Sequence, residues 1–547
     1  LILVPPGTYE EMVILYKPVK LQGAGAGSTV IRASRFPAEK IAVWQQKVAD
    51  ILAAGQADLL PAQQGALGPT EEGAGILVLG RQGVFSAATP AWIDGFQITG
   101  ANIGGGVLVN GYAPYTRISN NRIAANRGAY AGGIRVGHPF LIETVPGGGQ
   151  RYQSAYSDHV TIDHNHITGN GGNDGAGGGI SLCTGADAYQ VVGNYICGNF
   201  TSGHGAGIGH LGLSPGGEIR ENVISFNQSF NQGLSRNGGG LYIAGAPPLG
   251  GQLSPGSGDV TVQGNRIQGN NAGSGDGAGI ALERVNGQDV EAAPNTPSAW
   301  YRVTITQNVI VNNVTGRAGA GVSLQDALAE ITQNTIAHND STASTGDVVD
   351  PADPGKTLPQ PAGVVSRAHS PGLAGAFGAD PAADPYREYS NPVLDSNIIW
   401  QNRQFYVQID MTKPVGQQVR LMPDVDAGGV PPYADLAVLG TAAPAQLRPT
   451  NCVLTDTTGF DPADGNTMAD PGFVEPYFNG NPNKNDPANH PLSEASSMII
   501  AAALDEGGNF YDVLYGPLTV VGDYTAAGAG VGALSTEAFR MLSLAEP

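Results

Sequence analysis

The chain has 547 residues, 81 of them glycine, and its 27 basic and 47 acidic side chains give a formal net charge of −20 at pH 7. Such an acidic chain offers no broad basic face, which excludes nucleic acid and anionic membranes as partners and disfavours polyanionic glycans unless a cation bridges the two. No apolar run is long enough to form a transmembrane segment.

The first predicted elements are short strands at residues 13–15 and 19–23. Residues 33–90 then interrupt the strand pattern as an insertion, and the amphipathic stretch Ile41–Leu52 predicts a short helix within it. A regular body follows. Further insertions into it are expected at about 138–158, 245–258, 285–301 and 340–390.

The regular body repeats one motif, Asn-x-Ile-x-x-Asn, followed by a glycine-rich bend and an alternating apolar pair. The motif begins at Asn121, Asn165, Asn194, Asn222, Asn265, Asn308, Asn334 and Asn397. The apolar pairs include Val107/Val109, Ile134/Val136, Ile180/Leu182, Leu241/Ile243, Ile280/Leu282 and Val322/Leu324. Units of this length with variable insertions indicate a solenoid, in which each unit buries its apolar row only against its neighbours.

Apolar residues at period two, broken by Gly and Asn, predict short strands joined by tight bends. Stacked copies would form parallel sheets with strands about 4.8 Å apart and continuous inward columns of Ile and Val. Asn suits the bends because it tolerates left-handed backbone, and its amide can bond its stacked copies.

This pattern resembles the right-handed parallel β-helix superfamily of pectate lyases and polygalacturonases, over roughly residues 1–410. The resemblance implies an all-β right-handed parallel β-helix with loop insertions. Residues 411–547 are rich in Pro, Asp and Gly, and we expect them to be less regular and to pack on or cap the helix. In β-helix proteins a strand such as the one at Leu1 usually follows an N-terminal cap, so we expect the chain to be truncated or processed there.

The insertions fall at one corner of the coil, where long loops on flanking coils would make the walls of a cleft. The floor is predicted to contain Ser181, Gly209, His210 and Tyr242. We expect Ser181 and Tyr242 to bind substrate. His210 replaces an inward Leu or Ile of neighbouring coils, so it is either a hydrogen-bonded core residue or an acid or base in the cleft floor.

Residues 202–209 resemble the Gly-His-Gly-x-x-Ile-Gly segment of polygalacturonases, in which a histidine supports catalytic aspartates. The resemblance implies a catalytic role for His204. The aspartate pair of that family is absent, however, and the preceding coil offers only Asp174, which we assign to substrate binding. Inverting hydrolysis requires two carboxyl groups around a water molecule.

Alignment of the repeats places His204, Asn237 and Asp276 on one ladder in successive coils, within roughly 10 Å of one another. His204 and Asp276, with His210, are therefore the candidate catalytic residues, and Asn237 is a further substrate-binding candidate. The same ladder could instead hold a cation or be a solvated polar row at a bend.

Two segments could bind a divalent cation such as Ca²⁺. Asp163 and His166 lie in a segment, Thr161-Ile-Asp-His, that is similar to the Trp-Ile-Asp-His of pectate lyases, although Thr161 replaces the tryptophan. Asp461 and Asp464 place oxygen ligands around a glycine but lack the bidentate Glu of an EF-hand. Exposed polar turns are the alternative for both segments.

Two functions remain open. The first is an extracellular or cell-surface scaffold or binding module, part of a larger protein or assembly, that presents its loop-walled face to a polysaccharide or another surface protein. The alternative is a polysaccharide-active enzyme, either a lyase, a glycoside hydrolase or an epimerase. The missing carboxylate pair favours the first, and the many histidines near the predicted cleft favour the second.

Overall fold

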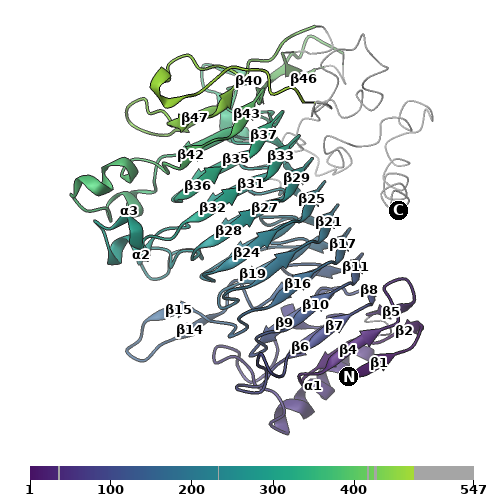
Figure 1. The fold of residues 1–547 in the computed structure, drawn as a ribbon. Helices are drawn as coiled ribbons and strands as arrows, with labels where there is room; N and C mark the ends of the chain where they lie inside the picture. Colours follow the sequence, from purple (N-terminus) through teal and green to yellow (C-terminus); the bar gives the residue numbers. More distant parts are fainter. Residues whose placement is uncertain (35–36, 38, 232, 415–417, 424–427, 474–547) are drawn as a thin grey trace.

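A computed structural model describes residues 1–34, 37, 39–231, 233–414, 418–423 and 428–473. The described chain winds into a parallel β-helix whose coils stack along one axis (Figure 1). Every strand in the stacked sheets pairs in parallel with its equivalents in the neighbouring coils, as the repeat predicts. Among the described residues no helix is long and apolar enough to cross a membrane.

Sheets A and B form two sides of the coil. Sheet A contains β1 (Ile2–Val4), β4 (Lys20–Gly23), β7 (Trp92–Asp94), β10 (Arg117–Ser119), β16 (Thr161–Asp163), β20 (Gln190–Val192), β24 (Gly217–Arg220), β28 (Val260–Gln263), β32 (Val303–Thr306), β36 (Ala329–Thr332), β42 (Val393–Asp395) and β48 (Pro449–Thr450). Sheet B contains β2 (Gly7–Tyr9), β5 (Thr29–Arg32), β8 (Gln97–Thr99), β11 (Arg122–Ala124), β17 (His166–Thr168), β21 (Tyr195–Cys197), β25 (Val223–Ser225), β29 (Arg266–Gln268), β33 (Val309–Val311), β37 (Thr335–Ala337), β43 (Ile398–Trp400) and β49 (Val453–Leu454).

Two further sheets close the coil. Sheet C contains β3 (Val13–Leu15), β6 (Ile76–Leu79), β9 (Val107–Gly111), β13 (Ile134–Val136), β19 (Ile180–Cys183), β23 (Ile208–Leu211), β27 (Leu241–Ala244), β31 (Ile280–Glu283), β35 (Val322–Gln325), β41 (Val364–Arg367) and β47 (Leu436–Leu439). Sheet D, of two-residue strands, contains β12 (Arg127–Gly128), β18 (Gly171–Gly172), β22 (Phe200–Thr201), β26 (Gln228–Ser229), β30 (Asn271–Ala272), β34 (Val314–Thr315), β38 (Asp340–Ser341) and β44 (Arg403–Gln404).

Each regular coil passes through the sheets in the order A, B, D, C, and its inward residues form the core. In one coil Ile162 on sheet A, Ile167 on sheet B and Leu182 on sheet C are fully buried. Their equivalents in the coils above and below belong to the same continuous apolar cluster. Burial of these columns excludes water from the coil interior, which supplies the main favourable term for folding.

The motif asparagines form two ladders at the bends on either side of sheet B. Asn222 shows the pattern: its amide nitrogen donates to Asn265 Oδ1 at 2.9 Å and to the carbonyls of Val191 and Arg220, while its Oδ1 accepts from the backbone N–H of Asn194. The predicted bonding between stacked asparagine amides is therefore confirmed. The second ladder runs from Asn126 to Asn402 in the same way.

Other residues end the ladders where the asparagine repeat stops. Cys452 Sγ accepts from the backbone N–H of Asn397, and Asp435 Oδ1 accepts from both the backbone and the side-chain nitrogen of Asn402. Strands β47, β48 and β49 thus continue sheets C, A and B beyond residue 410, where the sequence pattern ends. Residues 474–547 of the C-terminal region lie outside the described residues.

The insertions carry the elements that do not belong to the coil. The expected helix within residues 33–90 is α1 (Glu39–Ala53), which packs Trp44 and Val48 against sheet C. The other added elements are η1 (Pro69–Glu71), β14 (Ile142–Thr144), β15 (Gln150–Tyr152), α2 (Gln288–Ala292), η2 (Pro297–Ala299), η3 (Gly346–Val348), β39 (Val349–Asp350), β40 (Asp353–Thr357), α3 (Pro371–Ala374), η4 (Pro381–Tyr386), β45 (Tyr406–Ile409), β46 (Val419–Met422) and η6 (Pro462–Asp464). Residues 340–390 also contain β38 and β41, so this segment is partly coil and partly insertion.

Substitution of a central ladder residue tests this framework. We expect Asn222→Ala to lower the free energy of unfolding by about 2–4 kcal/mol, because it leaves buried carbonyls and the Asn194 N–H without partners. Chemical denaturation measures the change. Gln263→Ala is the matched control, since it removes only an exposed amide–amide bond to Gln307; equal destabilisation by the two variants would contradict a structural role for the ladder.

Candidate functional site

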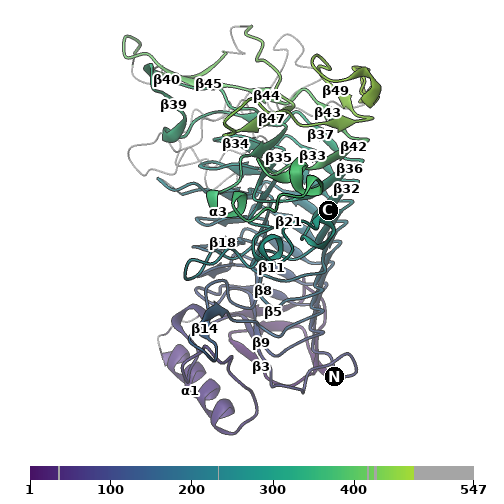
Figure 2. The ribbon, with the colours of Figure 1, turned by 90° about the vertical axis from the view of Figure 1, so that its left-hand side faces the viewer.

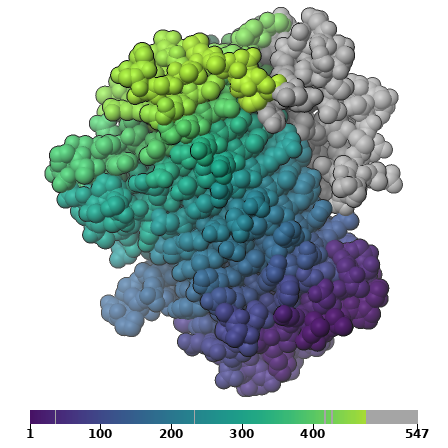
Figure 3. All heavy atoms as spheres, viewed as in Figure 1, coloured from purple at the N-terminus to yellow at the C-terminus, as the bar shows by residue number. Residues whose placement is uncertain are grey.

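The insertions gather on one side of the coil and make walls beside sheet C (Figures 1 and 2). The hairpin β14–β15 forms one projection, and α2, η2, α3 and η4 form another farther along the axis (Figure 3). In the second projection the Trp300 ring packs edge-on against Phe377 and Tyr386, over the buried side chains of Val290 and Leu373. These contacts join insertions 285–301 and 340–390 into one wall.

The predicted floor of the cleft is buried. Ser181, His210 and Tyr242 have no exposed surface, because glycine-rich connections fold over the outer face of sheet C. At Gly209 a Cβ atom would lie 2.5 Å from the backbone of Ala176, which shows how closely one connection covers this strand. The alternation of residues correctly places Ser181 and Tyr242 on the outer face, but the connections leave no open floor there.

His204 and Asn237 meet as the repeat alignment predicts. His204 Nδ1 accepts from the backbone N–H of Asn237 at 3.1 Å, and the imidazole stacks on the Tyr242 ring with centroids 4.5 Å apart. Burial lowers the pKa of His204 to about 4, so the ring is neutral at pH 7. Nε2 lies 3.4 Å from the Arg236 guanidinium, so neighbouring groups contact both ring nitrogens of His204.

His210 is part of the core rather than of an open surface. Its Nδ1 accepts from the Tyr189 hydroxyl at 2.9 Å, and its Nε2 donates to the carbonyls of Gly212 and Ser257. Burial lowers its pKa to about 4. Of the two alternatives for this position, the structure shows the hydrogen-bonded core residue.

Asp276 and Asp174 have very different surroundings. Asp276 is 4% exposed, and its carboxylate binds Arg367 at 2.7 Å and Arg317 at 3.4 Å while accepting from the backbone N–H of Ala318. These donors occupy both of its oxygens. Asp174 has an exposed side chain that reaches Arg236 only at 3.9 Å.

A pocket of about 190 Å³ lies at the end of strands β31 and β35. It is lined by Pro248, Leu253, Ser254, Glu283, Arg284, Asn286, Gly287, Gln325, Asp326, Ser370 and Leu373. These residues come from the coil, from insertion 245–258 and from the two insertions, 285–301 and 340–390, that form the wall. We call it the Glu283 pocket.

The predicted residues Tyr242 and Asn237 hold Glu283 in place from behind. The Tyr242 hydroxyl donates to Glu283 Oε2 at 2.7 Å, the Asn237 amide donates to Oε1, and Arg284 pairs with Oε2 at 3.2 Å. Burial acts to raise the pKa of Glu283, but the Arg284 charge and these hydrogen bonds outweigh it and hold the pKa below its ordinary value. The carboxylate is therefore ionised at neutral pH.

Asp326 places a second carboxylate on the pocket. Its Oδ1 accepts from His369 Nδ1 at 3.2 Å and from the backbone N–H of Ser370 at 2.8 Å. Burial acts to raise its pKa, but these hydrogen bonds and His369 lower it overall. Between the two carboxylates the Gln325 side chain makes no hydrogen bond within the described part of the chain, so its amide is available to a ligand.

The repeat contains a signal for Glu283, although Glu283 lies outside the repeated motif. In Ile280-Ala-Leu-Glu283 the residues Ile280 and Leu282 point inward, so alternation places Glu283 outward on the face that carries the insertions. Asp326 follows the equivalent strand of the next coil, β35. Neither residue belongs to a known motif, and both emerge only when the outward positions are compared coil by coil.

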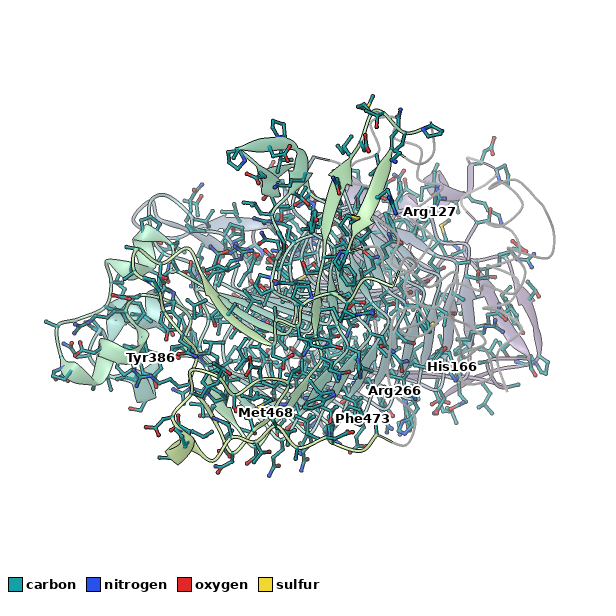
Figure 4. All side chains as sticks on the ribbon, turned by 90° about the horizontal axis from the view of Figure 1, so that it is seen from above. Arg127, His166, Arg266, Tyr386, Met468 and Phe473 are labelled. Atoms are coloured by element: carbon teal, nitrogen blue, oxygen red, sulfur yellow. The ribbon has the colours of Figure 1, made fainter. Side chains whose placement is uncertain are left out.

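The predicted metal ligands lie elsewhere. Asp163 binds Arg117 through both oxygens and contacts His164 at 2.9 Å, while His166 is exposed on sheet B (Figure 4, where His166 and Arg266 lie across the coil from Tyr386). Asp461 caps the 3₁₀ helix η6, accepting from the backbone of Ala463. No group of three or more His, Cys, Asp or Glu suited to a metal occurs in the described ranges, and calcium binding stays a prediction.

No protein-family model matches the sequence, and no curated protein matches it. Among solved structures, the crystal structure of DFA-IIIase from Arthrobacter chlorophenolicus A6 in complex with DFA-III is similar at 12% sequence identity and a TM-score of 0.25. The match covers 86% of this chain and 88% of that chain. At so low a TM-score the likeness carries no weight, and the parallel β-helix is established by the strand pairing itself.

Replacement of the two aspartates tests whether the ladder is structural. We expect Asp276→Asn to lower the free energy of unfolding by about 3 kcal/mol, because Arg317 and Arg367 lose a buried counter-charge. Asp174→Asn should change it by less than about 0.5 kcal/mol, since the pair is exposed and long. Urea denaturation of both variants measures the difference, and a mild effect of Asp276→Asn would contradict the assignment.

The buried His210 predicts a pH dependence of stability. Its pKa is about 4 in the folded chain and near 6.5 when unfolded, so only the unfolded state takes up the proton between these values. Stability should therefore fall as pH drops from 6.5 to 4, by up to about 1.4 kcal/mol per unit. His210→Leu, which restores the residue type of neighbouring coils, should make the slope shallower, whereas His166→Leu on the surface should not.

Proposed function

We propose that the protein binds a neutral glycan in the Glu283 pocket, as a scaffold or binding module at the cell surface or outside the cell. The observation that carries this proposal is the set of ionised carboxylates, Glu283 and Asp326, held rigid on either side of the free Gln325 amide. Carboxylate and amide groups in fixed positions are well suited to the hydroxyl groups of a sugar.

The size and charge of the pocket restrict the class of ligand that it can bind. A volume of about 190 Å³ is below the roughly 300 Å³ at which pockets for drug-sized ligands begin, which suits a single ring of a longer chain. Arg284 balances the charge of Glu283 inside the pocket, so it is the net charge of −20 over the whole chain that disfavours an acidic sugar. A neutral polysaccharide, or the neutral glycan of another surface protein, therefore fits better than a uronic-acid polymer.

The charge state of the carboxylates favours binding over cleavage. Hydrolysis of a glycosidic bond requires one carboxyl group with a raised pKa to act as the acid. Surroundings of Glu283 and Asp326 lower both pKa values, so neither holds a proton at neutral pH. The partnered states of His204 and Asp276 supply no substitute.

Glycan cleavage is the second candidate function, because most glycoside hydrolases use a pair of carboxyl groups as their catalytic residues. A screen of neutral polysaccharides for released reducing ends and for ultraviolet-absorbing unsaturated ends distinguishes the two functions. Turnover that disappears in Glu283→Gln would replace binding with catalysis as the function of this pocket.

The binding proposal is tested on an array of neutral oligosaccharides followed by calorimetry. We expect Glu283→Gln to weaken binding about tenfold or more, because it replaces a charge-assisted hydrogen bond with a neutral one.

The matched control is Glu330→Gln on β36, which removes the same charge from a half-buried residue of sheet A that pairs with Arg302. It should leave affinity unchanged. Equal affinity of the Glu283→Gln variant and the wild type, or a folded wild type that binds no glycan on the array, would refute the proposal.

A further inference from the structure

A second pocket lies near the N-terminal end of sheet C, away from the Glu283 pocket. It has a volume of about 360 Å³ and is lined by Ala62, Gln63, Gln64, Ala66, Leu67, Gly68, Thr70, Glu71, Tyr130, His138, Phe140 and Leu141. Insertion 33–90 supplies one side, and the segment that flanks β13 supplies the other. We call it the Glu71 pocket. None of its residues belongs to the repeated motif.

The base of this pocket is a buried ionic cluster. Glu71 is 4% exposed, and its Oε1 contacts Arg135 at 3.2 Å, His138 Nδ1 at 3.3 Å and the Thr70 hydroxyl. Arg135 is an outward residue of β13 that is 1% exposed, and it also donates to the Thr70 carbonyl at 3.1 Å. The Tyr130 ring covers its guanidinium at 5.2 Å.

The cluster is neutral as a whole. Burial acts to raise the pKa of Glu71, but His138 and Arg135 lower it to about 2, so the carboxylate is ionised. Burial lowers the pKa of His138, which leaves its ring neutral at pH 7. Since Arg135 already balances Glu71, a cationic ligand would gain little here, and a neutral hydrogen-bond donor is the better match.

The orientation of His138 is set by a chain of amides behind it. The backbone N–H of Leu60 donates to Gln63 Oε1 at 3.0 Å, which leaves the Gln63 nitrogen to donate to Asn110 Oδ1 at 2.8 Å. The same Asn110 oxygen lies 2.9 Å from His138 Nε2, so the two ring nitrogens contact Asn110 on one side and Glu71 on the other. The imidazole is thereby held against Glu71.

One oxygen of Glu71 is left for a ligand. All three contacts of the cluster go to Oε1, and no hydrogen bond from the described residues reaches Oε2. Gly68 lies close to this oxygen, because a Cβ added to Gly68 would be 2.8 Å from Oε2. Glycine at this position therefore keeps the oxygen open to the pocket.

The rim offers an apolar surface to the same ligand. Tyr130 and Phe140 lie edge to face with centroids 5.8 Å apart, and Phe140 remains 39% exposed. Leu67 and Leu141 complete this side. An aromatic face beside a single fixed acceptor suits a molecule with both C–H faces and hydroxyl groups.

We infer that the Glu71 pocket binds a neutral sugar ring, with a hydroxyl donating to Glu71 Oε2 and the C–H face of the ring against Phe140 and Tyr130. The choice of a sugar rests on the proposed glycan-binding function, whereas the pocket itself rests on its own geometry. Strands β13 and β31 are four coils apart, which sets the two pockets about 19 Å from each other along the axis. A glycan of several units could then occupy both, and affinity would rise steeply once a chain spans that distance.

Two substitutions that avoid the buried cluster test the inference by saturation-transfer NMR and calorimetry, with methyl pyranosides of glucose, galactose and mannose and with their oligosaccharides. Gly68→Ala, whose backbone is compatible with alanine (φ −76°), should block Oε2 and weaken binding about tenfold. Phe140→Ala should weaken binding by a similar factor, and Phe140→Tyr should restore it. Both losses should persist in a Glu283→Gln background, which isolates this pocket from the first.

Matched controls are Gly27→Ala, where an added Cβ meets no atom within 4 Å, and Phe200→Ala, whose side chain is 37% exposed on sheet D. Both should bind as the wild type does. Unchanged binding in Gly68→Ala and Phe140→Ala, or no saturation transfer from the folded wild type to any pyranoside, would overturn the inference. An effect of Glu283→Gln without an effect of Gly68→Ala would overturn it while leaving the proposed function intact.

Discussion

The bends beside sheet B are the constraint on which the rest of the molecule depends. A parallel coil must turn sharply several times per unit, and each turn leaves backbone groups that water cannot reach once coils stack. The asparagine ladders supply partners for these groups, with Oδ1 accepting from one coil and Nδ2 donating to carbonyls of its neighbours. Because each amide serves adjacent coils, the register of every sheet follows from the ladders.

The inner columns and the bends repeat from coil to coil, and both pockets described above lie beside sheet C. Glycine-rich connections close its middle, and the two pockets lie where insertions replace that cover. The Glu283 pocket carries two carboxylates that Tyr242, Asn237 and His369 hold in place, whereas the Glu71 pocket joins a buried ionic cluster to an aromatic rim. Rigid scaffolds commonly carry their binding groups on such added loops.

Much of the architecture is predictable because the same sequence pattern recurs in each coil. The ladder from Asn121 to Asn397 and the inward columns follow directly from spacing, as does the helix in residues 33–90. The ends of the ladders do not follow from the spacing, because there Cys452 and Asp435 replace asparagine as hydrogen-bond acceptors. The burial of the cleft floor and the role of Glu71 could not be predicted from the repeat either. The path of a connection and the packing of an insertion do not recur from coil to coil, so the periodic pattern carries no information about them.

The lengths of the ladder hydrogen bonds do not depend on the number of residues between the two partners. Asn308 and Asn334 are 26 residues apart and Asn334 and Asn397 are 63 apart, yet the backbone-to-amide distance is 2.9 Å in both steps. The entropic cost of a longer loop grows only with the logarithm of its length. Each coil therefore keeps the same backbone geometry whatever the length and chemistry of the loop it carries. Loops can be exchanged to change the binding specificity of the surface without altering the fold of the β-helix.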